Sequence, residues 1–127
     1  MLKFTVLQLK KIILSFFLLV FVANSGFFFA QSFIELRAKY GDLEENDERA
    51  LPFIKHYIDK AKREKDYTHL AQGYFDAGYY NADAPVKLKY ADSAIVSAKQ
   101  SNNDEKRITS YMMRGTLNYF YNRNYKT

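Results

Sequence analysis

The aromatic residues of this chain are sorted into two chemically different parts. Residues 1–30 hold seven of the eleven Phe and no acidic residue, whereas all eleven Tyr lie between Tyr40 and Tyr125. A helix that is apolar on every side needs a larger protein or a membrane around it, and a chain of 127 residues has room for a single core. We therefore expect a targeting segment at residues 1–30 and one folded region at residues 31–127.

The first part has the order of an export signal. It begins with a basic segment, continues with the apolar stretch IILSFFLLVFVA at residues 12–23, and ends in small residues. The basic residues are Lys3, Lys10 and Lys11. Because positive charge stays in the cytoplasm, the rest of the chain is expected outside it, in the periplasm or cell envelope.

Two cleavage sites and one uncleaved form are compatible with this signal. Ala23 and Ser25 make a small-x-small site, whereas a cut after Ala30 leaves Phe28 at a position that is usually small. Without cleavage the apolar span could act as a membrane anchor. The chain contains no Cys, which excludes a lipoprotein anchor and disulfides.

The folded region is close to neutral. Without the three lysines of residues 1–30, 16 basic residues remain against 14 acidic ones, a net charge of +2. The densest basic run, KAKREK at residues 60–65, is typical of the solvated C-terminal end of a helix. We therefore expect no nucleic acid to bind this region, and contact with a membrane only through residues 1–30 or a span downstream.

From residue 31 onward the chain reads as helices separated by short polar breaks, without the period-two alternation of strands. Pro52 falls in a first turn, where proline is tolerated, and Asn102 and Glu105 have the spacing of a capping box. The prediction is an all-α fold in which successive helices pack as antiparallel pairs. The expected helical segments are residues 32–40, 48–65, 66–80, 86–100 and the terminal segment at residues 110–127, with breaks at NADAP, residues 81–85, and SNND, residues 101–104.

Two of these segments resemble each other at an offset of 42 residues. LAQGYFDAGYY and MMRGTLNYFYN align with Leu70 on Met112, Gly73 on Gly115 and Tyr79 on Tyr121. The intervening helices each place an Ala three residues after an Ile, at Ile58 and Ala61 and at Ile95 and Ala98. Small residues at such spacing let helix axes approach closely, so the sequence predicts a repeated helix pair.

These features resemble the tetratricopeptide repeat (TPR) family. Ala91, Ile95 and Ala98 have the spacing of its second helix, and Gly115 and Tyr119 approximate the small and aromatic positions of its first helix. The chain departs from the family pattern in having no Trp and an offset longer than about 34 residues. The resemblance covers residues 32–127 and implies an α-solenoid that binds proteins or peptides without enzymatic activity or cofactors.

A narrower resemblance concerns the order of the segments. An export signal followed by Tyr-rich repeats is similar to the exported N-terminal part of bacterial regulators that join TPR repeats, a transmembrane helix and a cytoplasmic AraC-type helix-turn-helix domain. This resemblance implies a sensory region. Because the terminal segment looks like the first half of a repeat, we expect the chain to be part of a longer protein. Its last helix should then expose Met112 and Tyr119 and favour self-association.

No constellation of catalytic or metal-binding residues is visible in the sequence. His56 and His69 fall in different helices and form no metal-binding motif. The acidic segment at residues 41–48 lacks the ligand spacing of a calcium loop, and its expected role is to lead into a helix capped by Asn46 or Asp47. We therefore expect no metal site.

The candidate ligand-binding residues lie beside the expected core face of the helix at residues 66–80. That core face runs through Leu70, Gly73, Tyr74 and Ala77, and the adjacent face follows from a rotation of about 100° per residue. Tyr side chains suit peptide recognition because a rigid ring carries a polar hydroxyl. With the 42-residue offset, the predicted groove residues are His69, Gln72, Asp76 and Tyr80, together with Tyr111, Arg114, Asn118 and Asn122.

Two classes of function fit these observations. The first is an exported protein or peptide receptor, with the sensory role that the regulator resemblance implies. The second is a structural or assembly component of a cell-envelope complex. Neither class requires a cofactor.

Overall fold

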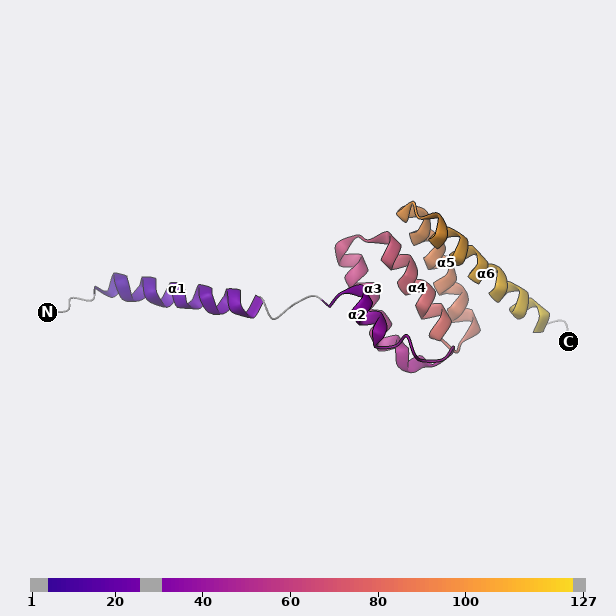
Figure 1. The fold of residues 1–127 in the computed structure, drawn as a ribbon, viewed down its shortest axis with the longest axis horizontal. Coiled ribbons are helices and arrows are strands. Elements are labelled where there is room, and N and C mark those ends of the chain that lie inside the picture. Colours follow the sequence, from indigo (N-terminus) through magenta and orange to yellow (C-terminus); the bar gives the residue numbers. More distant parts are fainter. Residues whose placement is uncertain (1–4, 26–30, 125–127) are drawn as a thin grey trace. The chain divides into compact units, whose positions relative to one another are not determined.

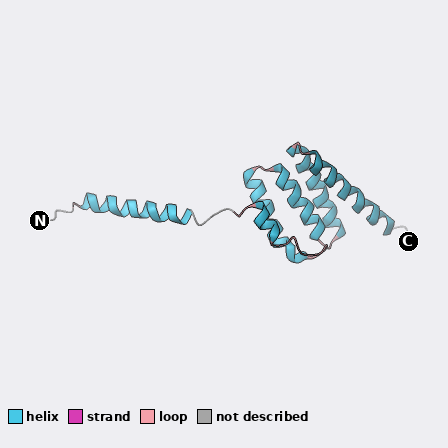
Figure 2. Ribbon diagram, viewed as in Figure 1, coloured by secondary structure: helices cyan, strands magenta, loops and turns pink. Residues whose placement is uncertain are grey.

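The computed structural model describes residues 5–25 and 31–124, and within these ranges every regular element is helical (Figures 1 and 2). The prediction of an all-α chain is therefore confirmed for the described residues. The chain forms two compact units, Met1–Gln31 and Ser32–Thr127. The elements are α1 (Val6–Ser25), α2 (Phe33–Ala38), the 3-10 helix η1 (Glu48–Ala50), α3 (Leu51–Glu64), α4 (Tyr67–Tyr80), α5 (Ala84–Ser101) and α6 (Asp104–Asn124).

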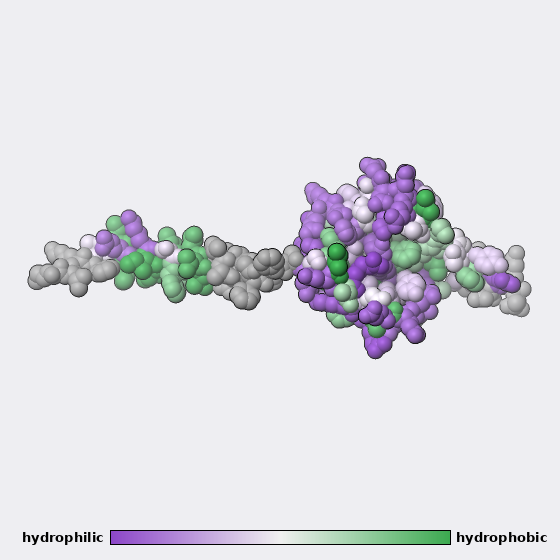
Figure 3. All heavy atoms as spheres, in the orientation of Figure 1, coloured by the Kyte–Doolittle hydropathy of each residue, from purple (hydrophilic) through white to green (hydrophobic). Residues whose placement is uncertain are grey.

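The described residues of the first unit include helix α1, whose apolar side chains from Val6 to Val20 are exposed (Figure 3). Lys10 and Lys11 lie within its first half. In the described part of the chain, no helix combines the length and the apolar composition needed to cross a membrane. Lys3, Phe28 and Ala30 of the predicted export signal lie outside the described residues.

The second unit begins with a fully formed capping box. The hydroxyl of Ser32 accepts a 3.1 Å hydrogen bond from the backbone N–H of Glu35, whose carboxylate accepts one of 3.0 Å from the backbone N–H of Ser32. This reciprocal pair satisfies two N–H groups that the helix itself leaves unpaired. The resulting α2 ends at Ala38, two residues before the end of the predicted segment.

The next helices begin largely as the sequence predicts. Asp47 caps η1 by accepting a hydrogen bond from the N–H of Arg49, and Pro52 lies in the first turn of α3. The N-cap of α5 is Asp83, so α5 begins at Ala84 inside the predicted NADAP break. Proline fits this start because the first turn needs no N–H donor.

The predicted capping box of Asn102 and Glu105 is wrong by one residue. Asn102 ends α5 in the left-handed conformation, with φ of 54°. The next residue, Asn103, caps α6, because its side-chain oxygen accepts a 3.1 Å hydrogen bond from the N–H of Lys106. Asn tolerates a left-handed backbone better than most residues, and this use as a helix stop displaces the cap by one position.

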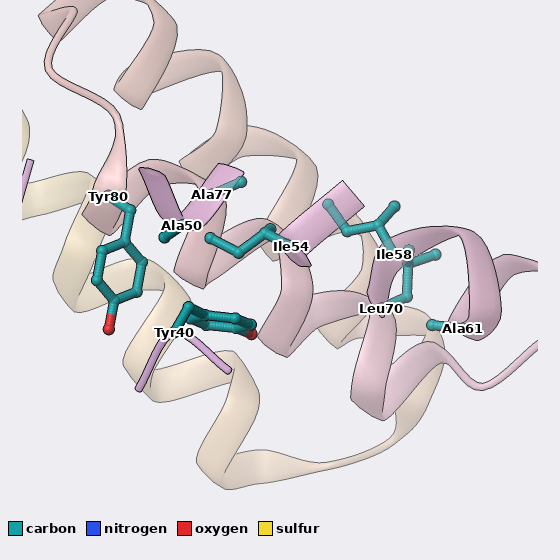
Figure 4. Packing of buried hydrophobic residues seen from close by; sticks show 8 residues of the cluster. All are labelled: Tyr40, Ala50, Ile54, Ile58, Ala61, Leu70, Ala77 and Tyr80. Carbon is teal, nitrogen blue, oxygen red and sulfur yellow. The ribbon is translucent and has the colours of Figure 1, made fainter. Parts of the chain in front are cut away.

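The core of the second unit lies where α3 and α4 pack together with the chain around Tyr40 (Figure 4). The predicted inner face of α4 is confirmed at Leu70, Gly73 and Ala77, all of which are buried. Helix α4 packs against both α3 and α5, and α5 packs against α6. The core cluster consists of Tyr40, Ala50, Ile54, Ile58, Ala61, Leu70, Ala77 and Tyr80.

The helix junctions repeat at a separation of 37 residues. Lys65 and Asn102 are both left-handed, with φ of 52° and 54°, and each is followed by the residue that caps the next helix, Asp66 or Asn103. The distance from residue 65 to 102 and from 66 to 103 is 37 in both cases. The same connection between two helices, a left-handed residue followed by a capping residue, therefore occurs twice in the described residues.

The packing around these junctions repeats in the same register. Ala61 and Ala98 are both fully buried. Lys62 lies over the ring of Tyr74 with its Nζ 5.8 Å from the centroid, and Lys99 lies over Tyr111 at the same distance. Ala98, Lys99 and Tyr111 follow their counterparts Ala61, Lys62 and Tyr74 by 37 residues each. The repeat therefore extends from the turn into the helices on both sides.

The predicted 42-residue alignment does not describe equivalent positions. A Cβ at Gly73 would lie 2.7 Å from Cγ1 of Ile58, whereas a Cβ at Gly115 would have no neighbour within 4 Å. The five-residue difference between the two offsets rotates a position by about 140° around a helix. The 42-residue alignment, which paired Gly73 with Gly115, therefore matched residues that lie on different helix faces.

Candidate binding groove between α4 and α6

The first four predicted groove residues do not form an open surface, because Asp76 and Tyr80 are buried. Asp76 is 3% exposed. Its carboxylate accepts hydrogen bonds from the hydroxyl of Tyr40 at 2.7 Å, from Nε of Arg37 at 3.1 Å and from Nε2 of Gln72 at 2.7 Å. We call Asp76 and its three donors, Tyr40, Arg37 and Gln72, the Asp76 network. They join α2 and the turn after it to the middle of α4.

Burial controls the ionisation of this network. Loss of hydration raises the pKa of Asp76 above its ordinary value, although the Tyr40 hydroxyl, the Arg37 charge and Gln72 act in the opposite direction. Burial and the neighbouring Asp76 carboxylate also raise the pKa of the Tyr40 phenol. The donors that surround Asp76 belong to the protein itself, so its main effect is on the fold.

Two further predicted residues are also held by packing. The ring of His69 stacks on Phe33 with a centroid distance of 3.8 Å, and its Nδ1 lies 2.7 Å from Oδ2 of Asp66. Tyr80 is buried and meets Tyr40 edge to face at 5.5 Å. Of the first four residues, Gln72 extends toward the next repeat, because its Oε1 accepts a 2.6 Å hydrogen bond from Nζ of Lys106.

The second four predicted residues lie elsewhere, along the contact between α5 and α6. Arg114 donates a 2.6 Å hydrogen bond from Nε to Asp92 on α5 and also contacts Asn118. Tyr111 lies beneath Lys99 of α5, and the side chain of Asn122 is outside the described residues. The structure therefore does not bring the two predicted sets onto one surface.

The 37-residue register identifies a different face of α6 as the counterpart of the first set. It pairs His69 with Lys106, Gln72 with Thr109, Asp76 with Met113 and Tyr80 with Leu117. These α6 residues do face α4: Lys106 bonds to Gln72, and the Met113 side chain fills the space beside Gly78. Because both contacts link positions 34 or 35 residues apart, α4 and α6 run in the same direction.

A groove of about 340 Å³ lies between these two parallel helices. Its lining is mostly apolar, and some of its apolar side chains also reach solvent, among them Tyr79, which is 39% exposed, and Met112, which is 65% exposed. Met side chains adapt to differently shaped apolar groups. The groove is lined by Phe75, Gly78, Tyr79, Met112, Met113, Thr116 and Leu117, with Thr109, Lys87 and Glu45 also contributing.

A lysine supplies the positive charge in this groove. The Lys87 side chain is 10% exposed, and its Nζ lies 3.2 Å from Oε1 of Glu45, whose own side chain is 56% exposed. An ammonium group has three donors, and a mostly buried ammonium must keep an anionic partner. Because Glu45 is more than half exposed, it can leave Lys87 when another anion takes its place.

A larger cavity of about 790 Å³ opens beside α3, α4 and α5. Its floor includes Ile54, Ile58 and Ala77 of the core, and charged residues from α3, including Lys55, Asp59 and Lys62, also line it. Lys55 and Asp59 form an ion pair at 2.6 Å. We favour the smaller groove because its side chains are less engaged with each other.

Metal binding has no support in the described residues, where no group of three or more His, Cys, Asp or Glu side chains could hold an ion. In the acidic segment, Glu45 pairs with Lys87, Asp47 pairs with Arg49, and Glu48 accepts a hydrogen bond from the N–H of Ala82. These carboxylates therefore serve local structure.

Sequence reasoning missed Phe75, Tyr79, Met112, Met113 and Leu117 as parts of one groove. A signal for them was present: each junction has a basic or amide residue followed by a capping Asp or Asn, at residues 65–66 and 102–103.

A scan against protein-family models and searches of curated proteins and of solved structures found no match to this chain. The site must therefore be interpreted from its own geometry.

Proposed function

We propose that residues 31–127 form a TPR-like helical-repeat scaffold that binds a protein or peptide, without enzymatic activity, in the groove between α4 and α6. The observation that carries this proposal is the partly exposed apolar lining of Tyr79 and Met112 between two parallel helices. Parallel helices one repeat apart leave a channel along their axes, which suits an elongated ligand. Further stacked repeats would extend the same channel.

The ligand chemistry follows from the groove lining. An apolar side chain of a peptide would be covered by Phe75, Met113 and Leu117, and this burial supplies most of the binding energy. An acidic residue next to that apolar anchor would replace Glu45 at the ammonium of Lys87. We therefore propose a peptide segment that carries an apolar residue beside an Asp or Glu.

Panning a phage-displayed library of linear peptides against the detergent-solubilised full chain tests this proposal. Selected peptides should be enriched in an apolar–acidic pair, and Met112→Ser or Tyr79→Ser should weaken their binding about tenfold or more, as expected for loss of an apolar anchor contact. Both positions tolerate a polar residue because they are exposed. The matched control is Val96→Ser on α5, which is 59% exposed and outside the groove.

Two results would reject the groove as the binding site. One is a library that yields no enriched sequence. The other is a set of selected peptides whose affinity falls equally for Met112→Ser and Val96→Ser.

We also propose that the chain is exported and that the scaffold lies in the periplasm or cell envelope, as the sensory part of a membrane-linked regulator. The exposed apolar surface of α1 and the preceding positive charge support export. A reporter enzyme that is active only after export should be active when fused after Thr127, and Leu18→Arg in the apolar stretch should abolish the signal. Activity of only a cytoplasmic reporter at the same position would contradict export.

A further inference from the structure

Helix α6 has an inner side that is buried against the rest of the unit and an outer side with exposed apolar side chains. One side contacts the rest of the unit and includes Ser110, which is 1% exposed. The other side carries Ile108, Met112 and Tyr119, which are 60%, 65% and 59% exposed. Met112 follows Ser110 by two residues, so the two side chains point about 200° apart.

The exposed apolar side chains form a straight row along the helix. Ile108, Met112, Gly115 and Tyr119 are separated by four, three and four residues, the spacing of one helix face. We call them the outer stripe. A Cβ at Gly115 would have no neighbour within 4 Å, so a second helix could approach closely at the middle of the stripe.

Opposite charges lie at the two ends of the outer stripe. Asp104, which also pairs with Arg107 of the same helix, precedes Ile108 by four residues, and Arg123 follows Tyr119 by four residues. Arg123 extends the stripe by lying over the Tyr119 ring at 5.7 Å. In an antiparallel pair of α6 helices, Asp104 lies opposite Arg123, Ile108 lies opposite Tyr119, and Met112 lies opposite Gly115. The stripe is therefore complementary in charge and size to a reversed copy of itself.

We propose that the outer stripe of α6 packs antiparallel against the outer stripe of a second copy of this chain. Ile108 then contacts Tyr119 of the second copy, Met112 packs over its Gly115, and Asp104 pairs with its Arg123. A parallel arrangement would place Asp104 against Asp104 and would also align the two helix dipoles unfavourably. This inference does not rest on the proposed peptide binding, but the two surfaces share Met112, which lies at the border between the groove and the outer stripe.

The dimer contact is limited to one helix from each copy. Such a contact buries less than the roughly 1,200–2,000 Å² of a stable interface, so the dimer exchanges on dilution and its detection needs covalent trapping. The chain has no Cys, and every disulfide therefore forms between cysteines that are introduced deliberately.

The test traps the dimer between two differently tagged full-length copies, one with Ile108→Cys and the other with Tyr119→Cys. Mild oxidation should join the two tags severalfold more often than it joins identical copies. Copies that both carry Val96→Cys, an equally exposed position on α5, give the background. Cross-linking at or below this background, or mainly between identical copies, would overturn the proposal.

A charge exchange in the same experiment tests the ends of the stripe. Adding Arg123→Asp to the Tyr119→Cys copy should lower the yield of the mixed dimer, because two carboxylates then face each other. Adding Asp104→Arg to the Ile108→Cys copy as well should restore the yield and thereby show that both variants fold. An unchanged yield after the first substitution, or no recovery after the second, would refute the antiparallel pairing.

Discussion

The hydroxyl of Tyr40 donates a 2.7 Å hydrogen bond to Oδ2 of Asp76, and both side chains are almost fully buried. This contact connects the turn after α2 to the centre of α4, across 36 residues of sequence. Because the acceptor is a buried carboxylate, loss of the donor leaves a poorly solvated charge.

Tyr40→Phe should therefore destabilise the second unit by about 1.5–3 kcal/mol, the range for a hydrogen bond to a charged group. The ring remains in place, so the packing against Tyr80 at 5.5 Å is retained. Urea denaturation followed by circular dichroism gives the change in free energy. Tyr67→Phe, at an exposed position, is the control, and equal changes for the two variants would contradict a special role for Tyr40.

The raised pKa of Asp76 makes its contribution to stability depend on pH. The folded protein binds this proton more tightly than the unfolded chain, whose Asp titrates near pH 4. Stability supplied by the protonated group is thus present below about pH 4 and is lost as pH rises through the higher folded pKa. The unfolding free energy of the wild type minus that of Asp76→Asn should fall as pH rises above about 4. A difference that grows with pH would show that Arg37 and Tyr40 outweigh burial.

The two glycines that the 42-residue offset aligned should respond in opposite directions to alanine. Gly73→Ala places a Cβ 2.7 Å from Ile58 and 3.0 Å from Tyr57, and such overpacking costs about 1–3 kcal/mol. Gly115→Ala meets open space and should stabilise α6 by up to about 1 kcal/mol through helix propensity. Thermal unfolding of the two variants measures the difference. Similar shifts would support the 42-residue alignment over the 37-residue register.

Ala98 and Lys99 provide a second matched comparison on α5. Ala98 is fully buried, whereas its neighbour Lys99 is exposed. Ala98→Leu should lower stability by about 1–3 kcal/mol because the close helix contact has no room for three more carbons, and Lys99→Leu should change it by less than about 0.5 kcal/mol. Comparable melting temperatures for the two variants would place Ala98 outside the contact.

The helices could be predicted from the sequence because their signals are local. Apolar spacing identified the inner face of α4 at Leu70, Gly73 and Ala77. The predicted cap was Asn46 or Asp47, and the structure uses Asp47. The start of α5 was predicted two residues late because Pro85 was assigned to the break, although proline also fits a first helical turn.

The groove could not be predicted because it depends on helix rotation. An error of five residues in the repeat offset turns a helix face by about 140°, which moved the predicted α6 residues from the groove to the α5 contact. The burial of Asp76 was also hidden, since its partners Arg37 and Tyr40 lie 39 and 36 residues away. Polar side chains on a helix normally indicate solvent, and only the tertiary contacts show that α2 covers this position.

The repeated junction has a consequence for how such a protein can change in length. The 37 residues from Lys65 to Ser101 begin at one left-handed stop and end just before the next, at Asn102. A gene segment of 37 codons copied in frame at this boundary would carry its own turn, its own cap and both complementary helix surfaces. Growth or shortening by whole units would then need no newly evolved connection.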